Sequence, residues 1–189
     1  MWDLISIHEM RRRAPLHYEV KADNARFSAY LLWKMSNDDN QKLAAELGYA
    51  GTPRGALIEA FRREAAIALE LMIKAVIAQR IESGIAKANI DKVKPTHNLP
   101  KLWNDASLPE LDSDGKRTLL IAKRVLFWSG RYAAPKRDSD FIKDQAEFDQ
   151  LKSEPSSAQN DLLRFGLFNW SDIDKVYRVA AGSFWALRQ

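Results

Sequence analysis

The sequence predicts an all-α protein, an antiparallel helical bundle with an additional N-terminal helical portion. Apolar residues recur mainly at spacings of three and four, few segments alternate with period two, and only eight of 189 residues are glycine. A hydrophobic fraction of 46% and a charged fraction of 29% are ordinary for a globular chain of this length. We expect residues 1–50 to form a helical extension packed on a core bundle of residues 51–189.

The first two expected helices lie in the N-terminal portion. Residues 24–35 place Phe27 and Leu31 on one helical face, with Lys34 or Met35 continuing it. Residues 40–48 predict a short helix that ends at Gly48, a glycine cap.

The longest predicted helix begins at Thr52 as N-cap and Pro53 as first residue, and ends between Arg80 and Ser83. Its length would be roughly 40–45 Å. Between residues 65 and 78 it is apolar almost all round, which is typical of a helix in the middle of a bundle.

Two charged residues interrupt this apolar stretch. Glu70 and Lys74 are four residues apart in the order that favours an ion pair on one helix. Either they pair at the edge of the core, or one of them lines a site.

A loop over residues 84–96 is expected next. Asn98 is a good N-cap for a short helix that starts at Leu99. Asp114 is the predicted cap of a helix over residues 115–131.

The last third of the chain predicts two more helices. Residues 140–152 are amphipathic, and residues 153–158 read as a turn or linker. The spacing from Ser171 to Asp174 resembles a capping box and predicts the start of the final helix.

Several chemistries are disfavoured by composition. The absence of cysteine excludes disulfides, a thiolate nucleophile and a cysteine-based zinc site. Three histidines at positions 8, 17 and 97 show no ligand spacing, and no glycine-rich phosphate loop is present. We therefore expect neither a metal site nor a cofactor.

The same features bear on location. Residues 65–78 are too short to cross a bilayer, and the positive charges of the first residues follow the apolar ones, the reverse of a secretory signal. We expect a cytoplasmic protein without membrane contact.

A basic stretch carries the clearest binding signal. Residues 115–137 contain seven basic residues and no acidic one, and Arg117, Arg124 and Arg131 repeat every seven residues, so they share a helical face. Arginine next to aromatic rings suits phosphates and stacked bases. The candidate binding residues are Arg117, Lys123, Arg124, Trp128, Arg131 and Tyr132. Alternatively, this face is solvated and paired with the acidic segment 138–149, or its arginines lie in a dimer interface.

His97 admits two interpretations. Its ring can pack against the long helix and bond to a backbone carbonyl or to Glu70, which would hold the start of the next helix in place. It can instead act as a base, or contact a nucleotide beside Arg131.

Three pieces in this order resemble the HEPN superfamily of helical domains. They are Glu70 with Lys74, then the turn His97-Asn98-Leu99, then Trp128 with Arg131 and Tyr132. The resemblance covers roughly residues 55–135 and, more loosely, the helix over 171–187. It implies a compact antiparallel HEPN-like bundle, often a homodimer, that is tied to nucleotide or RNA biology.

The chain departs from the ribonucleases of that family, many of which act in toxin–antitoxin systems. They carry an arginine followed after four to six residues by a histidine on the later helices, and here no histidine follows His97. Arg12 and His17 have such a spacing, but they lie outside the matched region and Pro15 stands between them.

Three functions remain open. The first is a non-catalytic or degenerate HEPN-like module that binds RNA or a nucleotide through the basic face, with a cognate partner protein as a further candidate partner. The second is a metal-independent ribonuclease or toxin that uses Arg12 with His17, or His97 with Arg131. The third is an interaction domain whose interface is the aromatic C-terminal part (Phe165, Phe168, Trp170, Phe184, Trp185).

Overall fold

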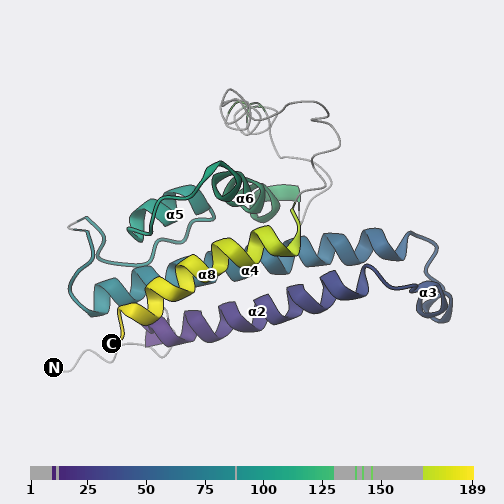
Figure 1. Cartoon of the computed structure of the whole chain (residues 1–189), viewed down its shortest axis with the longest axis horizontal. Coiled ribbons are helices and arrows are strands. Elements are labelled where there is room, and N and C mark those ends of the chain that lie inside the picture. Colours follow the sequence, from purple (N-terminus) through teal and green to yellow (C-terminus); the bar gives the residue numbers. More distant parts are fainter. Residues whose placement is uncertain are drawn as a thin grey trace.

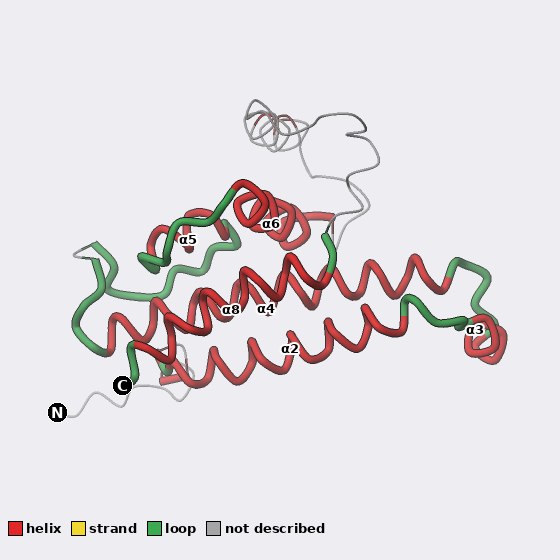
Figure 2. Tube along the Cα trace, viewed as in Figure 1, coloured by secondary structure: helices red, strands yellow, loops and turns green. Residues whose placement is uncertain are grey.

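The computed structural model describes residues 10–11, 13–87, 89–129, 139, 142, 146 and 168–189. Within these ranges every regular element is helical and no strand occurs, so the predicted all-α class is confirmed (Figures 1 and 2). The elements are α2 (Pro15–Met35), α3 (Gln41–Leu47), α4 (Pro53–Glu82), α5 (Leu99–Asp105), α6 (Ser113–Arg124), the π-helix η1 (Val125–Ser129) and α8 (Trp170–Ala186).

Helix α4 is the centre of the bundle. Figure 1 shows α2 and α4 side by side in antiparallel directions, with α8 running along them and ending near the start of α2. Helices α5 and α6 and η1 cover another side of α4. A central position follows from the sequence, because α4 is apolar almost all round from residue 65 to residue 78, Glu70 and Lys74 excepted.

The contact between α2 and α4 depends on small residues. Ala22, Ala25 and Ala29 are buried and follow one another at spacings of three and four, so they form a single stripe on α2. Side chains as small as alanine let two helices approach closely. Trp33 extends this contact by packing on Phe61 of α4, whereas Leu16, Val20, Phe27 and Leu31 remain exposed.

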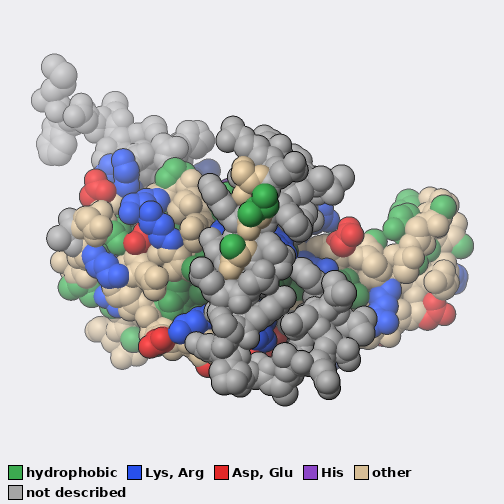
Figure 3. All heavy atoms as spheres, turned by 90° about the horizontal axis from the view of Figure 1, so that it is seen from above, with side chains coloured by type: hydrophobic (Ala, Val, Ile, Leu, Met, Phe, Trp, Pro, Cys, Tyr) green, Lys and Arg blue, Asp and Glu red, His purple; other side chains and the backbone are tan. Residues whose placement is uncertain are grey.

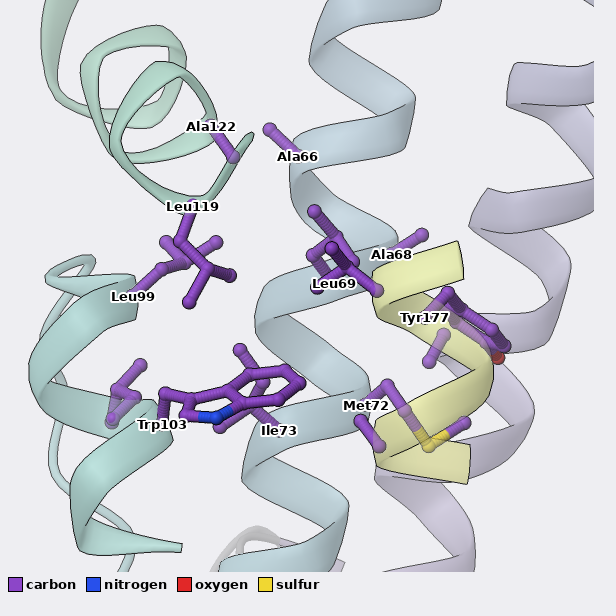
Figure 4. Packing of buried hydrophobic residues seen from close by; sticks show 14 of the residues in the cluster. Ala66, Ala68, Leu69, Met72, Ile73, Leu99, Trp103, Leu119, Ala122 and Tyr177 are labelled. Atoms are coloured by element: carbon purple, nitrogen blue, oxygen red, sulfur yellow. The ribbon is translucent and has the colours of Figure 1, made fainter. Parts of the chain in front are cut away.

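The core surrounds α4. In Figure 4, Leu99 and Trp103 of α5, with Leu119 of α6, lie on one side of α4, and Tyr177 of α8 lies on the other. The indole nitrogen of Trp103 donates a hydrogen bond to the backbone oxygen of Pro109, so this large ring is buried without an unsatisfied donor.

Most predicted helix ends are confirmed. Gly48 has φ 68° and ends α3, as the glycine cap requires. Helix α4 begins at Pro53 with Thr52 as N-cap, although the Thr52 side chain makes no capping bond, and it ends at Glu82. Asn98 caps α5 by accepting from the backbone N–H of Lys101 at 3.2 Å.

Two predicted caps are wrong. Helix α6 is capped by Asp112 and not by Asp114, because the extended backbone at Asp112 lets its carboxylate accept from the N–H of Gly115 at 2.9 Å. Helix α8 is capped by Asn169, whose side-chain oxygen accepts from the N–H of Asp172 at 3.1 Å. Ser171 already lies inside the helix and donates to Asn169.

The predicted helix over residues 115–131 is α6 followed by the π-helical turn η1 over Val125–Ser129. A π-helix widens the spiral, so the side chains beyond Arg124 do not continue the α-helical face. The predicted helix over 140–152 and the turn over 153–158 lie outside the described ranges, apart from single positions. The division into residues 1–50 and 51–189 stays a prediction.

Candidate anion-binding site around His97

A buried ion pair on α4 forms the base of the site. The ammonium nitrogen of Lys74 lies 2.5 Å from Oε1 of Glu70, and both side chains are about nine-tenths buried. The predicted pair is thereby confirmed. Charges at this depth are tolerated only when each has a close partner, so the two residues depend on each other.

The second carboxylate oxygen of Glu70 holds His97. Nδ1 of His97 lies 2.7 Å from Oε2 of Glu70. A carboxylate only accepts, so Nδ1 carries the hydrogen and donates it. Nε2, on the far side of the ring, points away from Glu70, and 40% of the His97 side chain is exposed. The interpretation that His97 bonds to Glu70 at the start of the next helix is confirmed.

The backbone on both sides of His97 is also fixed. The side-chain oxygen of Thr96 accepts from the N–H of Asn98, and Asn98 in turn caps α5. A histidine inside a chain of local hydrogen bonds has little freedom to turn. The ring is therefore presented to solvent in one orientation.

Phe127 stands beside the histidine. Its ring meets the His97 ring edge-on, with centroids 6.1 Å apart and planes at 84°. Phe127 belongs to the π-helical turn η1, and its side chain remains 48% exposed. π-Helical turns are frequent at functional sites because they redirect a side chain without ending the helix. Three separate elements thus converge on this spot: α4, the loop before α5, and η1.

The loop before α5 and the start of α5 make the surroundings positive. Residues 83–104 contain four lysines and a single acidic residue, Asp91. These lysines are Lys87, Lys92, Lys94 and Lys101. Figure 3 shows basic side chains gathered on the end of the molecule that carries α5 and this loop.

Two of these lysines are bonded within the chain, although Lys87 is also exposed. Lys94 lies 3.5 Å from Asp105, and Lys87 donates to the backbone oxygen of Asn104. Lys92 and Lys101 are exposed. Lys87 and Lys94 already bond within the chain, so Lys92 and Lys101 are the stronger candidates for contact with an incoming anion.

A shallow groove of about 810 Å³ adjoins the lysines between α5 and α6. Its lining is partly polar and partly apolar. The polar residues include Asn98, Lys101, Asn104, Glu110 and Lys116, and the apolar residues include Leu108, Leu111, Leu119 and Leu120. Lys116 is bonded to Glu110 at 2.9 Å, so the groove's net charge comes mainly from Lys101.

The basic face predicted on the later helix is arranged differently. Lys123 and Arg124 are 8% and 6% exposed, and Arg117 is bonded to Asp114 at 2.9 Å. Residues that bind an anion from solvent must be exposed, and this condition is not met at Lys123 and Arg124. Seven-residue spacing identifies residues that share a face, but it does not say that the face is turned outward.

The remaining predicted residues of that face fall outside what the structure describes. They are the side chain of Trp128 and the whole of Arg131 and Tyr132. Arg12 also lies outside, and His17 is exposed in the first turn of α2. The binding role of the face, and the pairings of Arg12 with His17 and His97 with Arg131, stay predictions.

The aromatic C-terminal part divides into core and surface. Phe168 and Phe184 are 2% and 0% exposed, whereas Trp185 is 49% exposed and packs its ring edge-on against Phe184. Phe165 lies outside the described residues. Most of this aromatic set that the structure describes therefore stabilises the bundle.

Neither the lysine-rich loop nor Phe127 was among the predicted site residues. The loop was detectable, since four lysines surround one acidic residue within 22 positions. The position of Phe127 was not detectable, because it depends on a π-helical turn that no residue pattern predicts.

Comparison with protein-family models, with curated proteins and with solved structures finds no match to this chain. Among the helices that the structure describes, none has the length and apolar character needed to cross a membrane. Across the same residues, no three acidic or histidine side chains converge as metal ligands do.

Proposed function

We propose that this protein is a non-catalytic, HEPN-like module that binds single-stranded RNA at the surface around His97. The observation that carries the proposal is the presentation of a fixed, partly exposed histidine beside an exposed phenylalanine at the edge of a lysine-rich loop. Lysines recognise phosphates as point charges, and exposed aromatic rings stack on unpaired bases. Phe127 packs on the His97 ring, and Lys92 and Lys101 lie five residues before and four residues after His97 in the chain.

The chain's charge supports the same choice of partner. The net charge is +4, and the loop before α5 and the start of α5 concentrate positive charge on one end of the molecule. A polyanion is steered toward such a surface, and its binding weakens steeply with salt. The groove next to Lys101 has room for a base, and the exposed Phe127 ring beside His97 offers a surface on which a base can stack.

The test is a titration of fluorescently labelled single-stranded RNA across a salt series. Replacing Lys92 and Lys101 by alanine removes two phosphate contacts, so the slope of log affinity against log salt should fall by roughly 1.4, about 0.7 for each contact. The matched control replaces Lys21 and Lys42, which are exposed on α2 and α3. If both double variants weaken binding equally, the binding is unspecific charge attraction and the site around His97 is refuted.

Base stacking is tested by a second comparison. Phe127→Ala should weaken binding of single-stranded RNA by about 1–3 kcal/mol and leave binding of duplex RNA unchanged, because paired bases are not free to stack. Free mononucleotides provide a further arm, since they carry the base and phosphate without the polymer. Tight binding of a mononucleotide would identify a nucleotide, rather than RNA, as the ligand.

A ribonuclease is the second candidate, and one observation favours it. A carboxylate that accepts from Nδ1 leaves Nε2 as an acceptor, which is how a histidine is oriented as a general base in many hydrolases. Such a base would take the proton of a ribose 2′-hydroxyl. RNA incubated with the protein and a chelator should then give cleavage products that His97→Ala abolishes. Intact RNA in a bound complex excludes this candidate.

A further inference from the structure

Helix α2 exposes an apolar stripe that nothing in the described chain covers. Leu16, Val20, Phe27 and Leu31 are 43%, 53%, 63% and 44% exposed. At 3.6 residues per turn these four positions fall within about 60° of one another. They lie away from Ala22, Ala25 and Ala29, which face α4. A cluster of exposed apolar residues along one helix face marks an interaction site more often than single exposed residues do.

A hollow of about 410 Å³ opens beside the middle of this stripe, between α2 and α8. Its walls are aromatic and charged. They consist of Asp23, Arg26, Phe27 and Tyr30 from α2 and Trp170, Asp174 and Arg178 from α8. Phe27 stands on the rim, because it lines the hollow and is still largely exposed.

The walls are held rigidly. Arg26 donates to Asp174 at 2.5 and 2.9 Å, and its guanidinium lies over the rings of Trp170 and Tyr177 at 5.9 and 4.8 Å. Tyr30 packs on Trp170 with ring centroids 4.9 Å apart. A hollow with fixed walls accepts an incoming side chain without having to order itself first.

We infer that α2 is the interface with a second copy of this chain, packed antiparallel so that each Phe27 enters the hollow of its partner. The protruding Phe27 side chain and the hollow are neighbours on one surface. A two-fold axis beside Phe27 therefore places the Phe27 of each copy at the hollow of the other, and both copies use the same patch. A different partner protein would have to supply both features itself. The chain already carries both.

The charges on the stripe also suit a two-fold arrangement, because an acidic residue of one copy can meet a basic residue of the other. Asp23 lies about one turn before Phe27, and Lys34 lies about two turns after it, both in line with the apolar residues. An antiparallel copy centred on Phe27 brings Asp23 within a helical turn of the partner's Lys34, and this happens twice. A parallel copy would instead set like charges opposite each other, which disfavours it.

Sedimentation across a wide range of protein concentration tests the inference, with no RNA present. The wild-type chain should be dimeric, and Phe27→Ser should weaken the dimer roughly thirtyfold or more, as expected for a central aromatic anchor. The matched control is Ile85→Ser, because Ile85 is 52% exposed in the loop after α4 and away from the stripe. Circular dichroism verifies that both variants remain folded.

A charge exchange identifies the arrangement itself. Asp23→Lys and Lys34→Asp should each weaken the homodimer, and an equimolar mixture of the two variants should form a heterodimer that restores it. Local damage at Asp23, which lies 3.6 Å from Arg26, would not be repaired by mixing. A wild-type monomer at every concentration overturns the inference, as does a dimer that Phe27→Ser leaves unchanged or a mixture that does not associate.

Discussion

Glu70 is the residue on which the candidate site depends, and its replacement by glutamine is the sharpest test of that statement. The substitution keeps the size of the side chain and removes its charge. It leaves the ammonium group of Lys74 buried without a counter-charge and turns the acceptor of His97 into a neutral amide oxygen.

The magnitude follows from burial. Lys74 is 8% exposed, and stranding one partner of a pair at this depth costs about 3–5 kcal/mol. In a chain of 189 residues this corresponds to a loss of roughly 6–20 °C in melting temperature, at about 2–4 °C for each kcal/mol. Thermal and urea unfolding followed by circular dichroism measure the two quantities independently.

Two companion variants locate the cause. Glu59→Gln on the exposed side of α4 should stay within about 0.5 kcal/mol of the wild type. Adding Lys74→Met to Glu70→Gln should recover much of the loss, because no buried charge is then left alone. The reasoning is refuted if Glu70→Gln unfolds like the wild type, or if the double variant is less stable than the single one.

Helix caps, a glycine turn and one carboxylate give further predictions. Asn169→Ala should destabilise the fold by about 1 kcal/mol, and Ser171→Ala by much less, since only Asn169 caps α8; urea unfolding distinguishes them. Gly48→Ala should cost about 1 kcal/mol because φ there is 68°, whereas Gly182→Ala inside α8 should stabilise by up to about 1 kcal/mol, because the added methyl group meets no other atom; both are read from melting temperatures. A hydrogen bond from Lys175, and then one from the N–H of Gly115, lower the pKa of Asp112 below its ordinary value. Asp112 therefore stabilises the fold above the unfolded-state pKa of about 4, and this contribution is lost as the pH falls through the lower folded-state pKa. The melting temperature of Asp112→Asn should accordingly fall less steeply than that of the wild type on acidification below about pH 4.

The central helix was predictable because its signals are local. A threonine and proline at one end, a serine and glycine at the other, and an apolar stretch between them determine where α4 starts, where it ends and that it is buried. The hydrogen bond between Glu70 and His97 was one of the predicted alternatives, since a carboxylate in an apolar helix requires a polar partner.

The orientation of α2 was not predictable in the same way. Phe27 and Leu31 stand out in the sequence, yet the fully or nearly fully buried residues of the helix include the alanines at 22, 25 and 29, while Trp33 packs on Phe61 of α4. Large apolar residues indicate a face, but the shape of the neighbouring helix decides which face is buried. For α6 the same limit applies: Lys123 and Arg124 are 8% and 6% exposed, although charged residues are usually expected on the surface.

Because the chain is synthesised from its N-terminus, the central position of α4 affects which apolar surfaces are exposed during synthesis. Helices α2 and α4 are close in sequence, so they can pair soon after residue 82 has left the ribosome. The surface of α4 that receives α8 has to wait for residues 170–186, far along the chain. Until then Met72 and its neighbours face water, and the nascent chain resembles the exposed intermediates that chaperones recognise. Stalled synthesis before residue 168 should therefore yield a chain that aggregates, even though its longest hairpin is already formed.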